Sequence, residues 1–443
     1  MLKTFSKGGV HPPGNKLSAG DAIEKLKLPE SVFIPLAQHI GSPAAPVVKR
    51  GDAIKTGQLI AKSSGFVSAN IHSSVSGKVK KVDLSLDSSG YLKQGIFIDV
   101  DGDDWIEEID RSEDLIKEIS LDRETIIKKI QEAGIVGLGG ATFPTHVKLV
   151  PPKGMKADVL LINGVECEPY LTSDHRLMLE KADEILIGTR LMMKALKVEK
   201  AVVGIENNKS DAIELFKEKT KEFSDISVVA LKVKYPQGGE KQLIKAVTGR
   251  EVPSGALPVA VGALVSNVGT VFAVYEAVQK NKPLFERVIT VTGKALADPA
   301  NYKVRIGTPT SLLIEAAGGL PADTGKVISG GPMMGVALQS IDVPVTKGTS
   351  GILIMREQES KREEAANCIR CSRCVDVCPM SLEPYYLKLV SEKQLFDKAE
   401  ENRISDCIEC GSCSFNCPSN IPLLDFIRFG KVTVGQIVRS RKK

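Results

Sequence analysis

The stretch CIRCSRCVDVCP occupies residues 368–379, and CIECGSCSFNCP repeats it at residues 407–418. Each copy has the spacing Cys-x-x-Cys-x-x-Cys-x-x-x-Cys-Pro, and the two copies hold eight of the nine cysteines in this 443-residue chain. Three thiolates spaced three residues apart on a tight turn can reach three irons of one cubane, while the fourth, beside a proline, points toward a second cubane. The repeat therefore predicts two [4Fe-4S] clusters in a helical C-terminal domain, residues 356–443.

This spacing resembles that of bacterial two-cluster ferredoxins, which implies crossed ligation. One cluster is expected on Cys368, Cys371, Cys374 and Cys417, and the other on Cys407, Cys410, Cys413 and Cys378. The alternative is a pair of Cys₄ zinc sites, because zinc also accepts thiolates. Structural zinc, however, normally uses two separated Cys-x-x-Cys knuckles with no third cysteine in register.

The composition is that of an ordinary globular protein, with 42% hydrophobic and 26% charged residues. The net charge is only +5 and aromatic residues make up 5%, so the chain offers no basic stacking surface for nucleic acid. The first residues, MLKTFSKGGV, show no secretory signal, which predicts a reducing, cytosolic setting without disulfides. Cys167, alone in the sequence, is expected to be a packed thiol, and no histidine is assigned as a ligand.

The most apolar window, residues 256–278, approaches the length of a membrane span but contains Pro258, Asn267 and Glu276. We therefore expect a buried loop leading into a helix and no transmembrane segment. Any attachment to a membrane would then depend on partner subunits.

Residues 1–100 are rich in short alternating strands, including VVKRGDAIKTGQ at 47–58 and SVSGKV at 74–79. These motifs resemble the barrel-sandwich fold of lipoyl and biotinyl carrier domains. The intervening loop, SSGFVSAN at 63–70, lacks the lysine that a carrier domain presents, so we expect a docking or structural module. The acidic residues 101–120 are predicted to form a linker.

Residues 121–284 alternate between helical and strand patterns, which predicts an α/β domain with a largely parallel sheet. Residues 285–355 read as a small mixed sheet with one helix, as in a β-grasp domain. The expected fold class is therefore multidomain, with α/β and β parts and a helical C-terminal part.

A glycine array, GIVGLGGATFPTHVK, spans residues 134–148. Closely spaced glycines let backbone amides approach an anion, and Lys148 supplies a positive charge. Two polar loops follow predicted strands, NGVECEP at 163–169 and GIENNK at 204–209, and two more, GGE at 238–240 and SNVGT at 266–270, come later in the chain. Open α/β sheets bind ligands at the carboxyl ends of their strands, so these loops are expected to converge there.

These motifs resemble those of the flavin- and NADH-binding subunit of respiratory complex I, whose glycine motif is G-x-x-G-x-G-G-A-G-F-P-T-G-x-K. The sequence departs from the related motifs at Thr142, His146, Val165, Cys167 and Gly269. The resemblance implies non-covalent FMN, with its phosphate over Gly137, Gly139, Gly140 and Lys148, and with Asn163, Asn267 and Thr270 near its ribityl chain and ring. Glu166, Glu168, Glu206 and Glu240 are the implied contacts to nicotinamide or ribose.

Over nearly all of its length the chain resembles the C-subunit family of Rnf electron-transport complexes, whose members combine these four domains in this order. That resemblance implies a peripheral subunit on the cytoplasmic side of the membrane, where electrons pass between NAD, FMN and two [4Fe-4S] clusters. Its implied partners are membrane subunits of the complex and a ferredoxin-type iron–sulfur subunit, with Na⁺ or H⁺ as the coupling ion. Two alternatives remain: a related cobalamin reductase of diol-utilisation microcompartments, and an electron-wire scaffold without a working nucleotide site.

Overall fold

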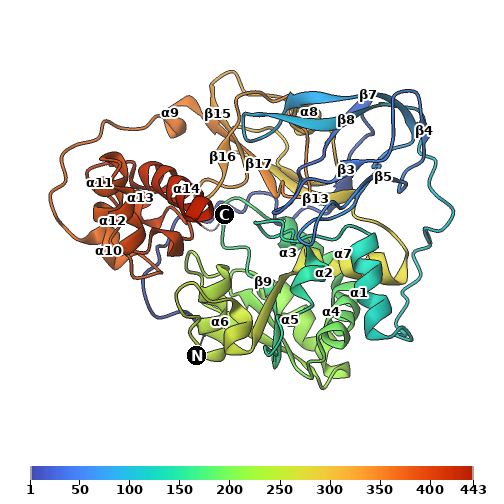
Figure 1. The fold of residues 1–443 in the computed structure, drawn as a ribbon, viewed down its shortest axis with the longest axis horizontal. Helices are drawn as coiled ribbons and strands as arrows, with labels where there is room; N and C mark the ends of the chain where they lie inside the picture. The colour runs from blue at the N-terminus through green and yellow to red at the C-terminus, as the bar shows by residue number, and fades with distance from the viewer. Residues whose placement is uncertain (1, 442–443) are drawn as a thin grey trace.

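The computed structural model describes residues 2–441. Four parts follow one another along the chain, and the helical C-terminal part lies to one side of the other three (Figure 1). Within the described residues, no helix combines the length and the apolar character needed to cross a bilayer.

The N-terminal β part consists of two antiparallel sheets that enclose one apolar core. The first sheet has the order β2–β8–β7–β4 and the second the order β3–β5–β6. Their strands are β2 (Ser31–Pro35), β3 (Ala45–Pro46), β4 (Ala53–Ile54), β5 (Leu59–Lys62), β6 (Ile71–His72), β7 (Gly77–Leu86) and β8 (Leu92–Val100). The loop at 63–70 docks on the neighbouring part, because the amide of Asn70 donates to the carbonyl of Glu132 at 3.1 Å.

The α/β part is built on a four-stranded, fully parallel sheet with the order β11–β10–β9–β12. Its strands are β9 (Val159–Gly164), β10 (Ala201–Glu206), β11 (Ile226–Leu231) and β12 (Ala263–Asn267). Its helices are α1 (Arg123–Glu132), α2 (Thr145–Lys148), α3 (Ser173–Glu180), α4 (Ala182–Leu196), α5 (Ser210–Lys219), α6 (Glu240–Thr248) and α7 (Val268–Gln279), with 3₁₀ turns η1 (Thr220–Glu222) and η2 (Pro258–Val261). The apolar window at 256–278 is therefore a buried strand followed by a helix, not a loop followed by a helix.

The third part is a six-stranded mixed sheet with the order β1–β14–β13–β17–β15–β16 and a single covering helix, α8 (Thr310–Ala316). Its strands are β1 (Ile23–Lys25), β13 (Glu286–Thr292), β14 (Ala300–Arg305), β15 (Thr324–Ser329), β16 (Val336–Ala337) and β17 (Gly351–Arg356). We expected the whole of residues 1–100 to belong to the barrel sandwich, but strand β1 joins this sheet instead. It does so because residues 23–25 pair in parallel with β14.

Residues 3–25, which we call the N-terminal strap, run across several parts of the molecule. Lys3 forms a bridge with Leu231, Val10 forms one with Tyr235, and the strap then ends in β1. Near its middle, a Cβ on Gly8 would lie 2.5 Å from the backbone of Cys378, so the strap touches the C-terminal part there.

Residues 101–120 contain no helix or strand, as expected for a linker, but several of their side chains are engaged. Asp110 pairs with Lys280 at 2.7 Å, and Asp103 pairs with Arg305 at 3.0 Å. Trp105 packs edge-on against Phe285. The segment therefore joins the parts that it connects.

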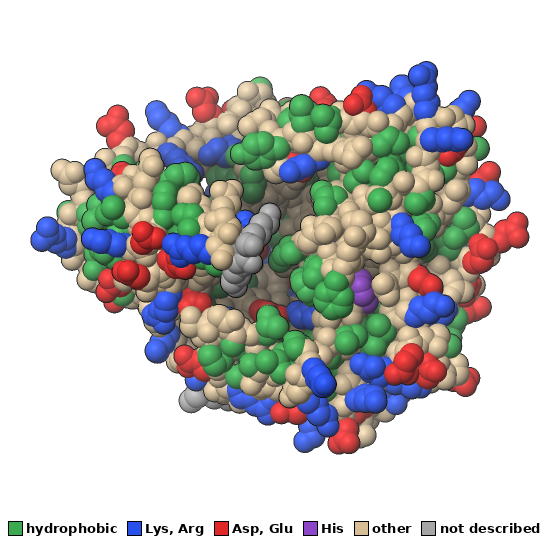
Figure 2. Space-filling model, in the orientation of Figure 1, with side chains coloured by type: hydrophobic (Ala, Val, Ile, Leu, Met, Phe, Trp, Pro, Cys, Tyr) green, Lys and Arg blue, Asp and Glu red, His purple; other side chains and the backbone are tan. Residues whose placement is uncertain are grey.

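The C-terminal part packs short helices against the long helix α14 (Leu423–Arg441), around an apolar core that includes Cys413, with Cys374, Cys378, Cys407 and Cys417 packed at its edge. Its other helices are α9 (Glu357–Ser360), α10 (Arg373–Asp376), α11 (Pro384–Glu392), α12 (Phe396–Glu401), η3 (Ile404–Asp406) and α13 (Ser412–Phe415). The molecular surface is hollowed between these helices and the rest of the chain (Figure 2).

Candidate functional site

The polar loops meet at the carboxyl edge of the parallel sheet, as the sequence predicted. Asn163 in β9 is the register partner of Asn267 in β12 and of Gly204 in β10. The amide of Asn163 donates to the carbonyl of Gly238 at 2.9 Å, which brings the GGE turn to the same edge. Four loops that are far apart in sequence thus surround one place, the position at which open α/β sheets bind ligands.

The glycine array forms a tight loop that rests on the N-terminus of α7. The N–H of Gly137 donates to the carbonyl of Phe143 at 2.9 Å, and the N–H of Leu138 donates to the hydroxyl of Thr270 at 2.8 Å. A Cβ on Gly139 would lie 2.8 Å from the Cβ of Asn267, so only glycine allows this approach. A Cβ on Gly140 would meet nothing within 4 Å, which leaves its backbone accessible to a ligand.

Asn267 connects this loop to a carboxyl group. It caps α7 by accepting the N–H of Gly269 at 2.9 Å, and its amide donates to Asp174 at 2.6 Å. Loss of hydration raises the pKa of Asp174 to about 7, and the nearby charge of Glu166 adds to the shift. Asp174 could not be recognised from the sequence, since nothing local distinguishes it from an ordinary helix-start aspartate.

The glycine loop is also held from another domain. Arg287 of β13 donates to the carbonyl of Leu138 at 3.2 Å and to the carbonyl of Lys347. Lys347 has no exposed surface, and its ammonium donates to the carbonyls of Asn70 and Gly134 at 2.8 and 2.7 Å. Burial lowers the pKa of Lys347 to about 7. Neither residue could be identified from the sequence, because both are distant along the chain from the loop that they support.

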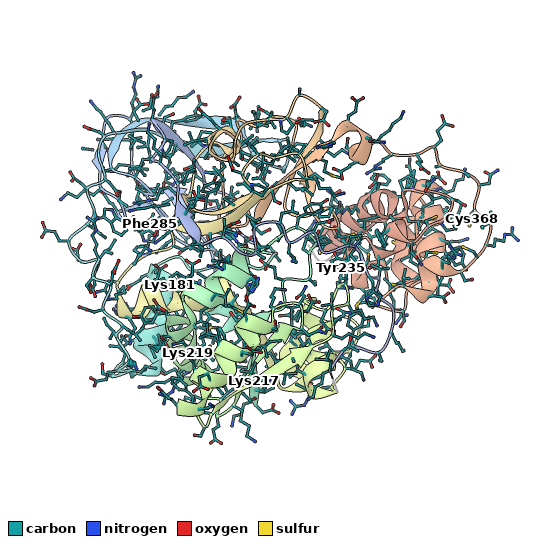
Figure 3. All side chains as sticks on the ribbon, turned by 180° about the vertical axis from the view of Figure 1, so that it is seen from behind. Lys181, Lys217, Lys219, Tyr235, Phe285 and Cys368 are labelled. Atoms are coloured by element: carbon teal, nitrogen blue, oxygen red, sulfur yellow. The ribbon has the colours of Figure 1, made fainter. Side chains whose placement is uncertain are left out.

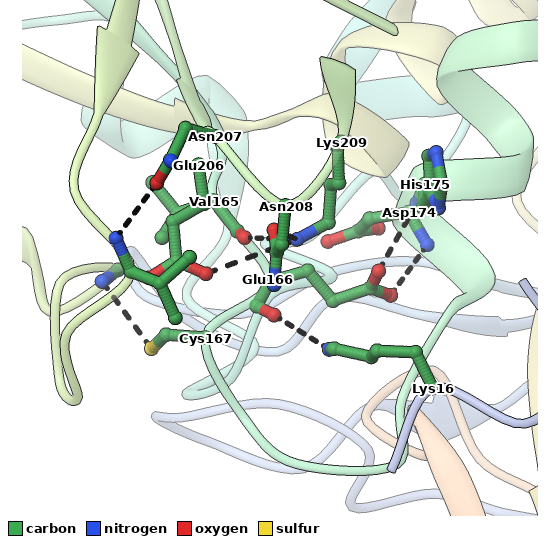
Figure 4. Close-up of polar contacts among 12 residues, drawn as sticks. Lys16, Val165, Glu166, Cys167, Asp174, His175, Glu206, Asn207, Asn208 and Lys209 are labelled. Atoms are coloured by element: carbon green, nitrogen blue, oxygen red, sulfur yellow. Dashed lines mark hydrogen bonds and ion pairs between the residues drawn. The ribbon is translucent and has the colours of Figure 1, made fainter. Parts of the chain in front are cut away.

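Two lysines, the half-buried Lys16 and the buried Lys209, hold the loop at 163–171 (Figure 4). The Lys16 ammonium donates to the carbonyls of Glu166 and Glu168 at 2.9 Å each and to that of Leu171 at 2.6 Å. Lys209 donates to the carbonyl of Val165 at 2.8 Å. Burial lowers the pKa of Lys16 to about 8. The loop is therefore fixed by positive charges on its backbone side.

The four glutamates assigned to the nucleotide have different surroundings. Glu166 accepts the N–H groups of Asp174 and His175 at 2.7 and 3.1 Å, so its carboxylate caps α3. Glu168 accepts the N–H groups of Met333 and Met334 at 2.6 and 3.1 Å. Both carboxylates therefore fasten the loop in this structure.

The other two glutamates lie near lysines. Glu206 is buried 3.9 Å from the Lys209 ammonium, and burial raises the pKa of Glu206 to about 7. Glu240 is partly exposed and pairs with Lys148 at 2.7 Å. Their assignment to nicotinamide or ribose stays a prediction, as does that of Glu166 and Glu168.

The eight motif cysteines differ in their surroundings. One cavity in the C-terminal part is lined by Cys378, Cys407, Cys410 and Cys413, together with apolar side chains. These four residues, which we call the inner cysteine set, are the group expected from crossed ligation. The remaining four, the outer set, comprise Cys368 and Cys371, which are exposed, and Cys374 and Cys417, which are half-buried.

The donors of both sites fit the expected cofactors. Four thiols around a cavity with apolar walls suit a cluster that thiolates bind. The open backbone at Gly140, with Lys148 on the following helix, suits a phosphate.

Cys167 lies between the two sites as an intermediate-exposure thiol that accepts the N–H of Gly238 at 3.3 Å. It packs against the buried cluster formed by Val10, Tyr235 and Cys410 of the inner set. This agrees with the expectation of a packed thiol.

Comparison with known families matches each part of the chain. Residues 4–103 match the RnfC barrel-sandwich hybrid domain, residues 130–276 the Nuo51 FMN-binding domain, residues 288–337 the SLBB domain and residues 360–422 the 4Fe-4S dicluster domain. The predicted fold class and order of domains are confirmed.

Curated relatives extend over the whole chain. It is 51% identical over 405 residues to the C subunit of the proton-translocating ferredoxin:NAD⁺ oxidoreductase complex of Clostridium ljungdahlii, covering 90% of this chain and 87% of the relative. It is 46% identical over 438 residues to the C subunit of the Na⁺-translocating complex of Acetobacterium woodii, covering 99% and 98%. The chain belongs to the RnfC family, the C subunits of Rnf complexes.

Family membership accounts for the presence of FMN-binding and 4Fe-4S domains in one chain, and the cofactor predictions of FMN and [4Fe-4S] clusters are confirmed at that level. Among solved structures, an NAD⁺-reducing [NiFe]-hydrogenase in the air-oxidized state matches 71% of this chain and 66% of its own chain, with a TM-score of 0.50 and 17% identity. That likeness concerns the fold alone. The names of the relatives do not favour the cobalamin-reductase or wire alternatives.

Proposed function

We propose that this chain is the NAD-reactive electron-transfer subunit of a membrane-bound ferredoxin:NAD⁺ oxidoreductase that couples electron flow to Na⁺ or H⁺ translocation. The single observation that carries the proposal is the packing of the inner cysteine set beside the loop at the sheet edge, through Cys410, Tyr235 and Cys167. The site proposed for the two-electron carrier, at the sheet edge, and the site proposed for a one-electron cluster, at the inner cysteine set, are then neighbours within one polypeptide.

FMN exchanges two electrons with a nicotinamide and single electrons with iron–sulfur clusters. In this proposal the backbone of Gly137, Gly139 and Gly140 and the Lys148 ammonium bind its phosphate. Asn163, Asn267 and Thr270 orient the ribityl chain and ring edge. The anchoring of the glycine loop by Arg287 supports this role, because a preorganised loop loses little conformational entropy when it binds a ligand.

The nicotinamide nucleotide is proposed to bind over the same edge, with Glu166, Glu168, Glu206 and Glu240 as candidate contacts. The Glu240 side chain is 40% exposed, so a ribose hydroxyl can reach it from solvent. The protein supplies binding and orientation here, and hydride transfer needs no general base.

The clusters are proposed to follow the crossed scheme, with one on the inner set and one on Cys368, Cys371, Cys374 and Cys417. The exposed Cys368 and Cys371 then make the outer cluster the exchange point with an external iron–sulfur partner. Figure 3 shows Cys368 on the far side of the C-terminal part from Tyr235. The membrane subunits of the complex are proposed to hold the chain at the cytoplasmic face of the membrane.

The decisive experiment is cofactor analysis after anaerobic purification, followed by titration with NADH. We expect about eight iron, eight sulfide and one FMN per chain, and bleaching of both flavin and cluster absorbance by NADH. Bound zinc in place of iron, or a fully loaded protein without flavin, would contradict the proposal. Bound FMN and clusters with an unchanged spectrum would instead support the wire alternative.

A further inference from the structure

Tyr235 lies at the contact between the inner cysteine set and the sheet-edge loop. Its side chain is only 2% exposed and packs with Cys410 of the inner set, with Cys167 and Met333 in the same cluster. In Figure 3 it sits where the C-terminal helices meet the α/β part. The residue belongs to neither the flavin-binding, the nucleotide-binding nor the cluster-ligating group proposed for this chain.

The backbone on both sides of this contact is fixed by the N-terminal strap. The N–H of Val10 donates to the carbonyl of Tyr235 at 2.8 Å, and the N–H of Tyr235 returns a bond at 2.9 Å. The adjacent Gly9 donates to the carbonyl of Val377 at 2.8 Å, one residue before Cys378. The strap thereby holds Tyr235 in register with the inner set.

The hydroxyl of Tyr235 is buried and has no hydrogen-bond partner of good geometry. A buried hydroxyl without a partner destabilises the fold, so this group calls for an acceptor. Two acceptors are close: the carboxylate of Glu168 and the sulfur of Cys410. Both backbone N–H groups that Glu168 accepts bind its Oε1 atom, so Oε2 is the competing acceptor for the phenol. A cluster on the inner set would add sulfur acceptors on the Cys410 side of the ring.

We propose that the Tyr235 hydroxyl donates a hydrogen bond to a sulfur of the cluster held by the inner cysteine set and thereby raises the reduction potential of that cluster. The inference rests on the proposed function. Reduction adds one negative charge to the cluster, and a donor aimed at its sulfur stabilises the more negative state. Hydrogen bonds to sulfur are among the means by which proteins set cluster potentials.

The test compares the anaerobically purified full chain with its Tyr235→Phe variant, in which the ring remains and the hydroxyl is lost. Tyr302→Phe is the matched control, because Tyr302 is 4% exposed and donates its hydroxyl to the carbonyl of Ala316 within the β-grasp part. Iron, sulfide and FMN contents are measured first. Redox titration followed by EPR, and proton ENDOR of the reduced protein in H₂O and D₂O, then report on the clusters.

In Tyr235→Phe we expect one of the two clusters to be reduced at a lower potential than in the wild type. We also expect the ENDOR spectrum to lose one exchangeable proton that couples to that cluster. The second cluster, the flavin potential and the Tyr302→Phe control should not change. Unchanged cluster potentials with an unchanged ENDOR spectrum would overturn the inference. A shift of the flavin potential alone would also overturn it, because the hydroxyl would then act on the flavin site and not on the cluster. Absence of clusters from the wild-type chain would instead refute the proposed function itself.

Discussion

The ammonium of Lys148 lies 2.7 Å from the carboxylate of Glu240, although 92 residues separate the two in sequence. The pair joins helix α2, which follows the glycine loop, to the first turn of α6. Both side chains are partly exposed, so the pair by itself adds little stability. Its interest lies in its position, because a phosphate on the glycine loop would compete with Glu240 for the same ammonium.

Replacing Lys148 by Met should weaken FMN binding. Loss of one charge-assisted hydrogen bond costs about 1.5–3 kcal/mol, which corresponds to about a 10- to 150-fold rise in Kd. Glu240→Gln should leave FMN affinity equal or higher, since it releases the lysine. Flavin fluorescence quenching on titration of the flavin-free protein measures both. Lys153→Met, at an exposed lysine in the loop after α2, is the control, and equal affinities for Lys148→Met and this control would refute the phosphate assignment.

Two glycines of the array should respond differently to alanine. A Cβ on Gly139 would press on Asn267 at 2.8 Å, so Gly139→Ala should lower both Tm and FMN affinity. A Cβ on Gly137 would have its nearest neighbour at 3.8 Å, so Gly137→Ala should keep the wild-type Tm and lower FMN affinity alone. Thermal scans of the flavin-free variants and flavin titration separate the two effects. If Gly137→Ala binds FMN normally, the phosphate does not lie over this glycine.

Lys347 should make stability depend on pH. Its pKa in the folded protein is lowered by burial to about 7, from an ordinary value of 10.5, so between these values the unfolded chain binds the additional proton. The contribution of Lys347 to the free energy of unfolding therefore rises with pH across that window, by about 2 kcal/mol between pH 7 and pH 9.

The measurement is the Tm difference between the wild type and Lys347→Met at several pH values. We expect this difference to grow as the pH is raised from 7 to 9, because the neutral amine still donates to the carbonyls of Asn70 and Gly134. Lys62→Met, at an exposed lysine of β5, should show a constant difference. A constant difference for Lys347→Met would contradict the assigned pKa direction.

Crossed ligation can be tested with pairs of cysteine substitutions. Cys378→Ala together with Cys410→Ala removes two ligands of one cluster in the crossed scheme, so about four irons per chain should remain. In an uncrossed scheme the same pair damages both clusters. Cys371→Ala with Cys410→Ala is the matched control, since it affects both clusters under either scheme. Iron analysis and EPR of the reduced proteins show which clusters remain. Loss of both clusters from the Cys378→Ala, Cys410→Ala double variant would exclude crossed ligation. The single variant Cys378→Ala is measured as well, to show that the chain still folds.

The local sequence was sufficient for the parts of this protein whose chemistry depends on spacing. The cysteine repeat, the glycine array and the polar residues that end the strands could be read directly, because neighbouring residues on a turn or at a strand end occupy predictable relative positions. Strand β12 was missed, since a short apolar run does not distinguish a buried strand from a loop or helix.

The residues that hold the site together became visible only in the folded chain. Lys16 reaches the loop at 163–171 across about 150 residues of sequence, Arg287 supports Leu138 from a different domain, and the strap places Tyr235 beside the inner cysteine set. None of these contacts leaves a periodic or compositional trace. Each depends on where a buried charge or hydroxyl finds its partner once the domains pack, and long-range packing is not encoded in the spacing of neighbouring residues.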